Sequence, residues 1–148
     1  MGGALTKGGI WLLFESQNQI DLRERSPLEL AFVGDGVYEL LVRAREVERT
    51  RMKPNRLHSG AVKFVSAKGQ FEALRFIEPL LTDEERDMVR RGHNASKASV
   101  AKNASPEEYR ASTGFECLLG YLYLSKRTAR IEELFDAIWV QFSAQWAC

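Results

Sequence analysis

The sequence contains few cysteines and histidines, which limits the chemistry that it can support. Its two cysteines, Cys117 and Cys148, form no CxxC pair, and its two histidines belong to no His-Asp doublet, HExxH motif or zinc-binding pattern. A phosphate-binding P-loop and a GxSxG nucleophile elbow are also absent. These absences disfavour zinc enzymes, serine hydrolases of the GxSxG type and phosphohydrolases that depend on His-Asp doublets.

Long hydrophobic runs and a strong net charge are absent as well. No run approaches the roughly 18 apolar residues that a membrane span requires, and residues 1–16 show no signal-peptide pattern. Cys117 is expected to be a buried core thiol, a usage that suits a reducing compartment, so we predict a cytoplasmic protein. The formal net charge is only +1, so any affinity for nucleic acid has to come from local basic patches.

The sequence shows no strand-like alternation but carries several helix-start signals. Ser26 and Ser105 each precede a proline and stand three residues before a glutamate, which is the pattern of a capping box. Thr82 and Glu85 form a third such pattern. These signals and the apolar spacing predict helices over residues 27–48, 54–78 with a break at 66–69, 82–91, 106–125 and 129–146.

The predicted elements form one all-α domain over residues 26–146. A flexible arm over residues 1–25 precedes it, and residues 92–105, rich in small polar side chains, are expected to form a mobile loop. The helices over 27–48 and 106–125 are too apolar for surface elements. We expect them to pack side by side, in the centre of the domain or at a dimer interface.

Asp35 lies in a setting that stability alone does not explain. It stands between Gly34 and Gly36 in an apolar helical segment, and no Lys or Arg occurs between Arg25 and Arg43. A buried carboxylate without a partner is costly, and each glycine weakens a helix by about 1 kcal/mol relative to alanine. A second helix or a metal ion is therefore expected close to the backbone here. The alternative is a glycine pair that packs two helices beside an acid that pairs with a distant arginine.

Glu116 repeats this arrangement in a second apolar helix. It has Gly114 before it and Gly120 after it, and it is the only ionisable side chain other than Tyr and Cys between Arg110 and Lys126. Two facing carboxylates at low dielectric suit Mg²⁺, which takes one or two protein carboxylates together with water and phosphate oxygens. Such a site can hydrolyse a phosphodiester, so the pair suggests cleavage of a nucleic-acid backbone.

Basic residues concentrate in two segments. Residues 43–63 contain seven Lys and Arg against two acids, and residues 86–102 contain five against one acid. A solvated surface is the ordinary interpretation of the first segment. The second includes the predicted loop, and long loops within compact domains are often functional.

The two acid-bearing segments resemble the two motifs of the ribonuclease III family. Residues 32–35 match the family's Phe-Leu-Gly-Asp core, and residues 113–120 are similar to its Asp-x-x-Glu-Ala-Leu-x-Gly motif. Two acids of the family pattern are missing, because Ala31 and Thr113 stand in their places. The full four-carboxylate pattern of the family is therefore absent.

This combination resembles the Mini-ribonuclease III branch of the family. Its members are short, lack a separate double-stranded-RNA-binding domain and keep only the two acids that match Asp35 and Glu116. The resemblance extends over residues 26–140. Further matching segments are residues 53–55, 65–68, 91–95 and 109–124.

The resemblance implies an all-helical, homodimeric endoribonuclease that requires Mg²⁺ and cleaves double-stranded RNA. The role implied for it is the trimming of precursor large-subunit (23S) ribosomal RNA. Each protomer would supply one site, with Asp35 and Glu116 as catalytic residues and Mg²⁺ ligands. Phe32 matches the family aromatic residue that inserts into the partner subunit; the alternative is an ordinary core residue of its own subunit.

Without a separate RNA-binding domain, the catalytic domain itself has to hold the RNA. Lys and Arg contacts to phosphates supply affinity, and A-form RNA is recognised largely by its shape. The residues that we expect to contact RNA are Lys68, Arg91, His93, Asn94, Lys97 and Lys102. Two further hypotheses place Glu39 and Thr113 near water molecules of the metal ion, although Glu39 could equally pair with an arginine.

Two alternative functions remain open at this point. Loss of two of the four family carboxylates would also occur in a catalytically inactive RNA- or ribosome-binding protein on the same fold. A purely structural dimerisation module is the other alternative, but it leaves the two core acids unexplained. Random loss of the family's acidic residues would not selectively retain Asp35, Glu116 and their neighbouring glycines, so an enzymatic function is favoured.

Overall fold

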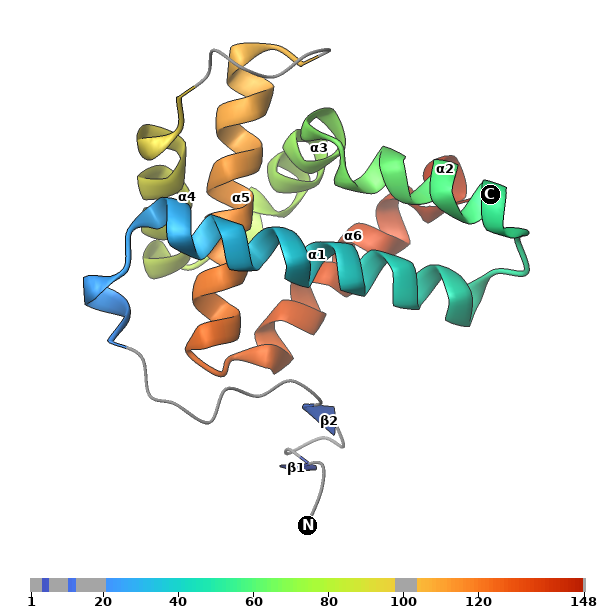
Figure 1. Ribbon diagram of the computed structural model, residues 1–148, viewed down its shortest axis with the longest axis horizontal. Coiled ribbons are helices and arrows are strands. Elements are labelled where there is room, and N and C mark those ends of the chain that lie inside the picture. Colours follow the sequence, from blue (N-terminus) through green and yellow to red (C-terminus); the bar gives the residue numbers. More distant parts are fainter. Residues whose placement is uncertain (1–3, 6–10, 13–20, 98–103, 148) are drawn as a thin grey trace.

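The computed structural model describes residues 4–5, 11–12, 21–97 and 104–147, and within these ranges it is almost entirely helical (Figure 1). Two-residue strands β1 (Ala4–Leu5) and β2 (Trp11–Leu12) pair antiparallel in the predicted arm. The helices are α1 (Pro27–Arg49), α2 (Pro54–Val65), α3 (Ala67–Ile77), α4 (Asp83–Ala95), α5 (Pro106–Leu124) and α6 (Thr128–Trp146), with short 3-10 turns at Leu22–Glu24 and Glu78–Leu80. The predicted all-α fold is confirmed.

Local side-chain caps start the helices where the sequence predicts. At α1, the Ser26 hydroxyl accepts a hydrogen bond from the Glu29 amide at 3.1 Å, and the Glu29 carboxylate accepts one from the Ser26 amide at 2.9 Å. The same reciprocal box opens α4 and α5. The predicted break between α2 and α3 falls at Ser66, whose hydroxyl accepts a hydrogen bond from the Gly69 amide.

The end of α4 differs from the prediction. We expected the helix to stop near Arg91 and a loop to begin at residue 92, but α4 continues to Ala95. Gly92 explains the difference, because a Cβ there would lie 2.6 Å from the Cys117 Cβ and 2.9 Å from the Gly114 Cα. The glycine lets α4 pack closely on α5, and this packing extends the helix through a segment with little local helical signal. Residues 98–103 lie outside the described residues.

The centre of the fold is the crossing of α1 and α5 (Figure 1). A Cβ on Gly34 would lie 1.7 Å from the carbonyl oxygen of Glu116, and one on Gly120 would lie 1.8 Å from the carbonyl oxygen of Leu30. The two backbones are therefore in direct contact, which only glycine permits. The side-by-side packing predicted for these two helices is confirmed.

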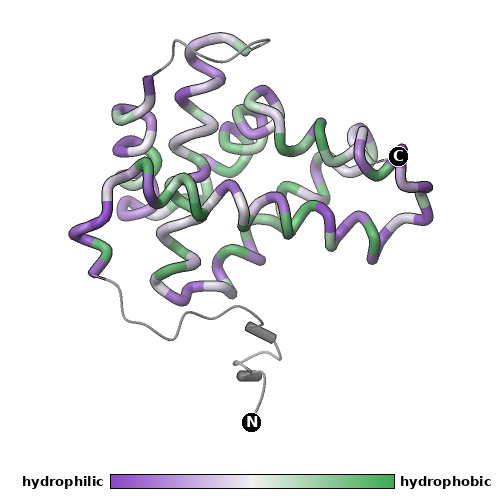
Figure 2. Tube along the Cα trace, in the orientation of Figure 1, coloured by the Kyte–Doolittle hydropathy of each residue, from purple (hydrophilic) through white to green (hydrophobic). Residues whose placement is uncertain are grey.

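The remaining helices bury the apolar faces of α1 and α5. Cys117 is fully buried, as predicted, and the inner face of α6 is buried from Ile131 to Phe142. Aromatic rings join these elements, with Tyr38 edge-on to Phe115 at 4.9 Å between ring centroids. Hydrophobic and hydrophilic positions alternate along the helices (Figure 2), and no helix of the described residues is long and apolar enough to cross a membrane.

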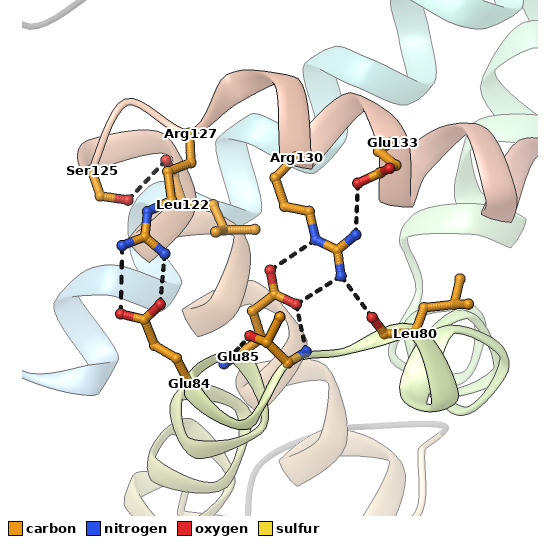
Figure 3. Close-up of polar contacts among 9 residues, drawn as sticks. Leu80, Glu84, Glu85, Leu122, Ser125, Arg127, Arg130 and Glu133 are labelled. Carbon is orange, nitrogen blue, oxygen red and sulfur yellow. Dashed lines mark hydrogen bonds and ion pairs between the residues drawn. The ribbon is translucent and has the colours of Figure 1, made fainter.

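A buried ion pair fastens α6 to the start of α4 (Figure 3). The Arg130 guanidinium donates to both carboxylate oxygens of Glu85, at 2.8 and 2.9 Å, and to the Leu80 carbonyl at 2.7 Å. Glu85 is only 3% exposed and also accepts the Thr82 amide in the capping box. Arg127 pairs with the neighbouring Glu84 at 2.6 Å. Since each buried oxygen of Glu85 is satisfied only while the pair is intact, removal of either partner would destabilise the junction.

The two glycines beside Asp35 should respond oppositely to alanine. Gly34→Ala should lower the free energy of unfolding by about 3 kcal/mol, because the added methyl group would overlap the backbone of α5. Gly36→Ala adds a methyl group with no atom within 4 Å and should raise it by up to about 1 kcal/mol, because alanine is the better helix former. Urea unfolding at matched protein concentration measures both. Equal losses would contradict a close crossing at Gly34.

Candidate active site

Asp35 and Glu116 come together where α1 crosses α5. Gly34 lies directly against the Glu116 backbone, so the next residue of α1, Asp35, is brought to the Glu116 side chain. The two carboxyl groups are close enough to interact directly. Asp35 is exposed, whereas Glu116 is mostly buried. The pair therefore has one solvent-facing carboxylate and one carboxylate set into the fold.

The buried carboxylate has an unusual protonation equilibrium. Burial, followed by the negative charge of Asp35, raises the pKa of Glu116 to about 8. No arginine of the described residues forms an ion pair with either acid, so the alternative of a structural pairing with a distant arginine is not found. Two carboxylates without a cation beside them provide a site that a divalent cation would stabilise.

Gln70 is a part of the site that sequence reasoning missed. This residue of α3 is 2% exposed, and its amide nitrogen donates to the Glu116 carboxylate at 3.1 Å and to the Val65 carbonyl at 2.9 Å. A lone glutamine carries no local signal of function. The break at Ser66 could have indicated the role of Gln70, because it turns α3 so that the first turns of this helix face α5.

The two further residues proposed near the metal ion have partners within the fold. Glu39 accepts a hydrogen bond from Arg43 at 2.9 Å, which is the alternative considered for it. The Thr113 hydroxyl is buried and contacts the Tyr109 carbonyl at 3.1 Å and the Ser96 hydroxyl at 3.3 Å. Thr113 thus links the end of α4 to α5.

The sequence matches a known protein family. The sequence matches the family model of the Ribonuclease III domain over residues 28–127. The chain belongs to the ribonuclease III family. The Mini-ribonuclease 3 of Symbiobacterium thermophilum is 47% identical over 111 residues, which cover 75% of this chain and 85% of that protein. The Mini-ribonuclease 3 of Staphylococcus aureus is 39% identical over 126 residues, which cover 84% of this chain and 94% of that protein.

A solved structure supports the same assignment. A crystal structure of a protein from Fusobacterium nucleatum superposes with a TM-score of 0.71 at 28% sequence identity, covering 80% of this chain and 94% of that chain. The resemblance to the ribonuclease III family is therefore confirmed, and the chain is an endoribonuclease of this family.

The residues of the acid pair fit a magnesium ion of the kind that this family implies. The site offers two carboxylates, and the buried Gln70 amide donates a hydrogen bond to one of them. No group of three or more His, Cys, Asp or Glu that could hold a metal occurs within the described residues. Mg²⁺ prefers oxygen ligands and keeps several of its waters, so a site with only two carboxylates suffices.

The predicted RNA-contact residues that the structure describes lie on α3, on the last turns of α4 and just after its end. Lys68 is exposed in the first turn of α3, on the same turn as Gln70. The others follow one another at the end of α4, where Asn94 and Lys97 are exposed while Arg91 and His93 are partly buried. The His93 ring contacts the Glu107 carboxylate at 3.2 Å. Lys102 lies outside the described residues.

Phe32 is not a core residue of its own subunit. Its side chain is 84% exposed on α1, with the exposed Leu28 and Leu40 on the same helix. An aromatic ring exposed to this extent beside other apolar side chains is typical of an interaction surface. The alternative role considered for it, in the protomer core, is therefore wrong.

The raised pKa of Glu116 should make the stability of the metal-free protein depend on pH. Between its ordinary value of 4.5 and about 8, the folded chain holds a proton on this group that the unfolded chain releases. The stabilisation is complete below about pH 4.5 and is lost as the pH rises through about 8. Urea unfolding in the presence of a chelator should therefore show a steeper decline for the wild type than for Glu116→Gln. Parallel curves would contradict the raised pKa.

Proposed function

We propose that this protein is a Mg²⁺-dependent endoribonuclease that cleaves double-stranded RNA in the cytoplasm, and that its substrate is precursor 23S ribosomal RNA. The observation that carries the proposal is the contact between Asp35 and Glu116 at a glycine crossing, where no arginine of the described part of the chain pairs with either acid. Such a pair destabilises the metal-free protein, so its presence is best explained by a bound cation. The relatives named Mini-ribonuclease 3 support the substrate class.

Each residue of the site then has a distinct task. A Mg²⁺ ion held there would lower the pKa of a bound water molecule and stabilise the negative charge of the phosphodiester displacement. Asp35, which is exposed, would hold the ion where RNA can reach it. Glu116, which is held by Gln70 and by the helix crossing, would be its second ligand.

The RNA duplex is proposed to lie over α3 and the end of α4. Five of the candidate contacts are in the described residues, namely Lys68, Arg91, His93, Asn94 and Lys97, and Lys102 is retained from the sequence. Cationic side chains there contact phosphates without reading bases, which suits recognition of A-form RNA by its shape. By contrast, the exposed Arg43 pairs with Glu39, whereas Arg45 pairs with Asp136 and is only 14% exposed, so neither is proposed as an RNA contact.

We also propose that the protein is a homodimer in which Phe32 inserts into the partner. The exposed apolar residues of α1 would then be covered by a second copy of the same helix. A two-fold arrangement presents one active site to each strand of a duplex, so that both strands can be cut.

Removal of either acid should abolish cleavage without abolishing RNA binding. Asp35→Asn and Glu116→Gln should each reduce Mg²⁺-dependent cleavage of a long RNA duplex by about a hundredfold or more, because each removes a metal ligand. Glu48→Gln, which changes an exposed acid on the same helix as Asp35, is the matched control and should cleave normally. Gel assays of cleavage and of binding separate the two effects.

The same assay addresses the inactive RNA-binding alternative. A wild-type protein that binds duplex RNA but does not cleave it with Mg²⁺ or Mn²⁺ would favour that alternative over the proposed enzyme. Normal cleavage by Asp35→Asn or Glu116→Gln would show instead that the chemistry lies elsewhere.

Replacement of Phe32 should disrupt the dimer. Phe32→Glu should weaken self-association by about a hundredfold or more, because two buried rings are lost per dimer. Val140→Glu is the matched control, since Val140 is an apolar residue that is 80% exposed on a different helix, α6. Sedimentation velocity over a concentration series measures both variants. Equal dissociation constants for the two variants would argue against the proposed interface.

A further inference from the structure

Gln70 occupies a position where its side chain contacts both the active site and the corner between α2 and α3. Its amide nitrogen donates one hydrogen bond to Val65, the last residue of α2, and one to Glu116 on α5. The corner itself is tight, because a Cβ on Gly69 would lie 2.0 Å from the Lys63 carbonyl oxygen. Gln70 is therefore held in a fixed place relative to the acid pair.

The two hydrogen bonds determine which way the amide faces. The Val65 carbonyl can only accept, so the atom beside it has to be the nitrogen of Gln70 and not its oxygen. Both N–H groups of that nitrogen are then used, one on Val65 and one on Glu116. The carbonyl oxygen Oε1 of Gln70 is left on the other side of the amide.

This oxygen is buried and accepts no hydrogen bond from the described residues. Two other buried side-chain oxygens of the described residues share this condition, those of Tyr38 and Glu46, but of the three residues only Gln70 is hydrogen-bonded to Glu116. A buried acceptor without a donor costs stability. An apolar side chain of similar size would avoid that cost, so stability alone does not explain a glutamine here.

We infer that Gln70 is a positioning residue for the metal ion: its nitrogen orients the Glu116 carboxylate, and its free oxygen accepts a hydrogen bond from a water molecule that hydrates the ion. This inference rests on the proposed function. It satisfies every polar atom of the amide. An amide oxygen also provides an acceptor without adding a third negative charge beside Asp35 and Glu116.

Two substitutions at this position separate a role at the ion from a role in the corner. Gln70→Met and Gln70→Glu both remove the donor to Val65 and to Glu116, so a role limited to these two hydrogen bonds predicts equal effects of the two variants on Mn²⁺ affinity. They differ at the ion, because methionine offers no oxygen and glutamate keeps one. Leu74→Met, one turn later on the same buried face of α3, is the matched control for repacking.

The measurement is Mn²⁺ binding to the full-length protein without RNA, followed by electron paramagnetic resonance. Gln70→Met should weaken binding by about tenfold, the usual effect of removing a group that orients a metal ligand. Gln70→Glu, which loses the donor to Glu116 but keeps an oxygen acceptor, should bind Mn²⁺ more tightly than Gln70→Met, and Leu74→Met should bind it as tightly as the wild type does. Urea unfolding in the presence of a chelator measures the stability of each variant, so that affinities are compared under conditions where every variant is folded.

The outcomes separate this inference from the proposed function. Wild-type Mn²⁺ affinity in Gln70→Met, or an equal loss in Gln70→Met and Gln70→Glu, would overturn the role of Gln70 while leaving the metal site intact. Failure of the wild type to bind Mn²⁺ more tightly than Asp35→Asn would overturn the metal-dependent function, and this inference with it.

Discussion

The backbone contact between α1 and α5 is the constraint on which the rest of the structure depends. Gly34 and Gly120 let the two helices approach until carbonyl groups of one touch the other. At that separation, residues far apart in sequence share one small volume, and Asp35 meets Glu116. Larger residues at positions 34 and 120 would increase the separation of the two helices, and each acid would then be hydrated separately. The repulsion between the two carboxylates is therefore a consequence of the helix packing.

Glu85 and Glu116 have pKa values shifted in opposite directions, and the difference separates a structural role from a functional one. Arg130 holds the pKa of Glu85 below its usual range by hydrogen bonding to it, and the capping amide of Thr82 satisfies it further. Glu116 is shifted in the opposite direction by burial and by a second acid. Residue type alone does not distinguish them. The distinction lies in the partners, because one carboxylate is fully compensated and the other is left for a cation.

The sequence predicted most of the fold because its signals are local. Serine and threonine caps fixed the starts of α1, α4 and α5, and the glycines around two unpaired acids marked the helices that meet. The features that were missed depend on distant contacts. The last turn of α4 is helical because Gly92 packs on α5, and Gln70 enters the site because of the turn at Ser66. Neither contact leaves a pattern within its own segment.

The ion pair between Glu85 and Arg130 couples the local unfolding of α4 to that of α6. Glu85 holds the first turn of α4 closed and at the same time binds α6, so separating α6 removes a partner from the helix start. Segments joined in this way exchange their amide hydrogens together, as one cooperative unit. The end of α4, with its proposed RNA contacts, would thus be coupled in its local unfolding to the C-terminal helix on the far side of that junction.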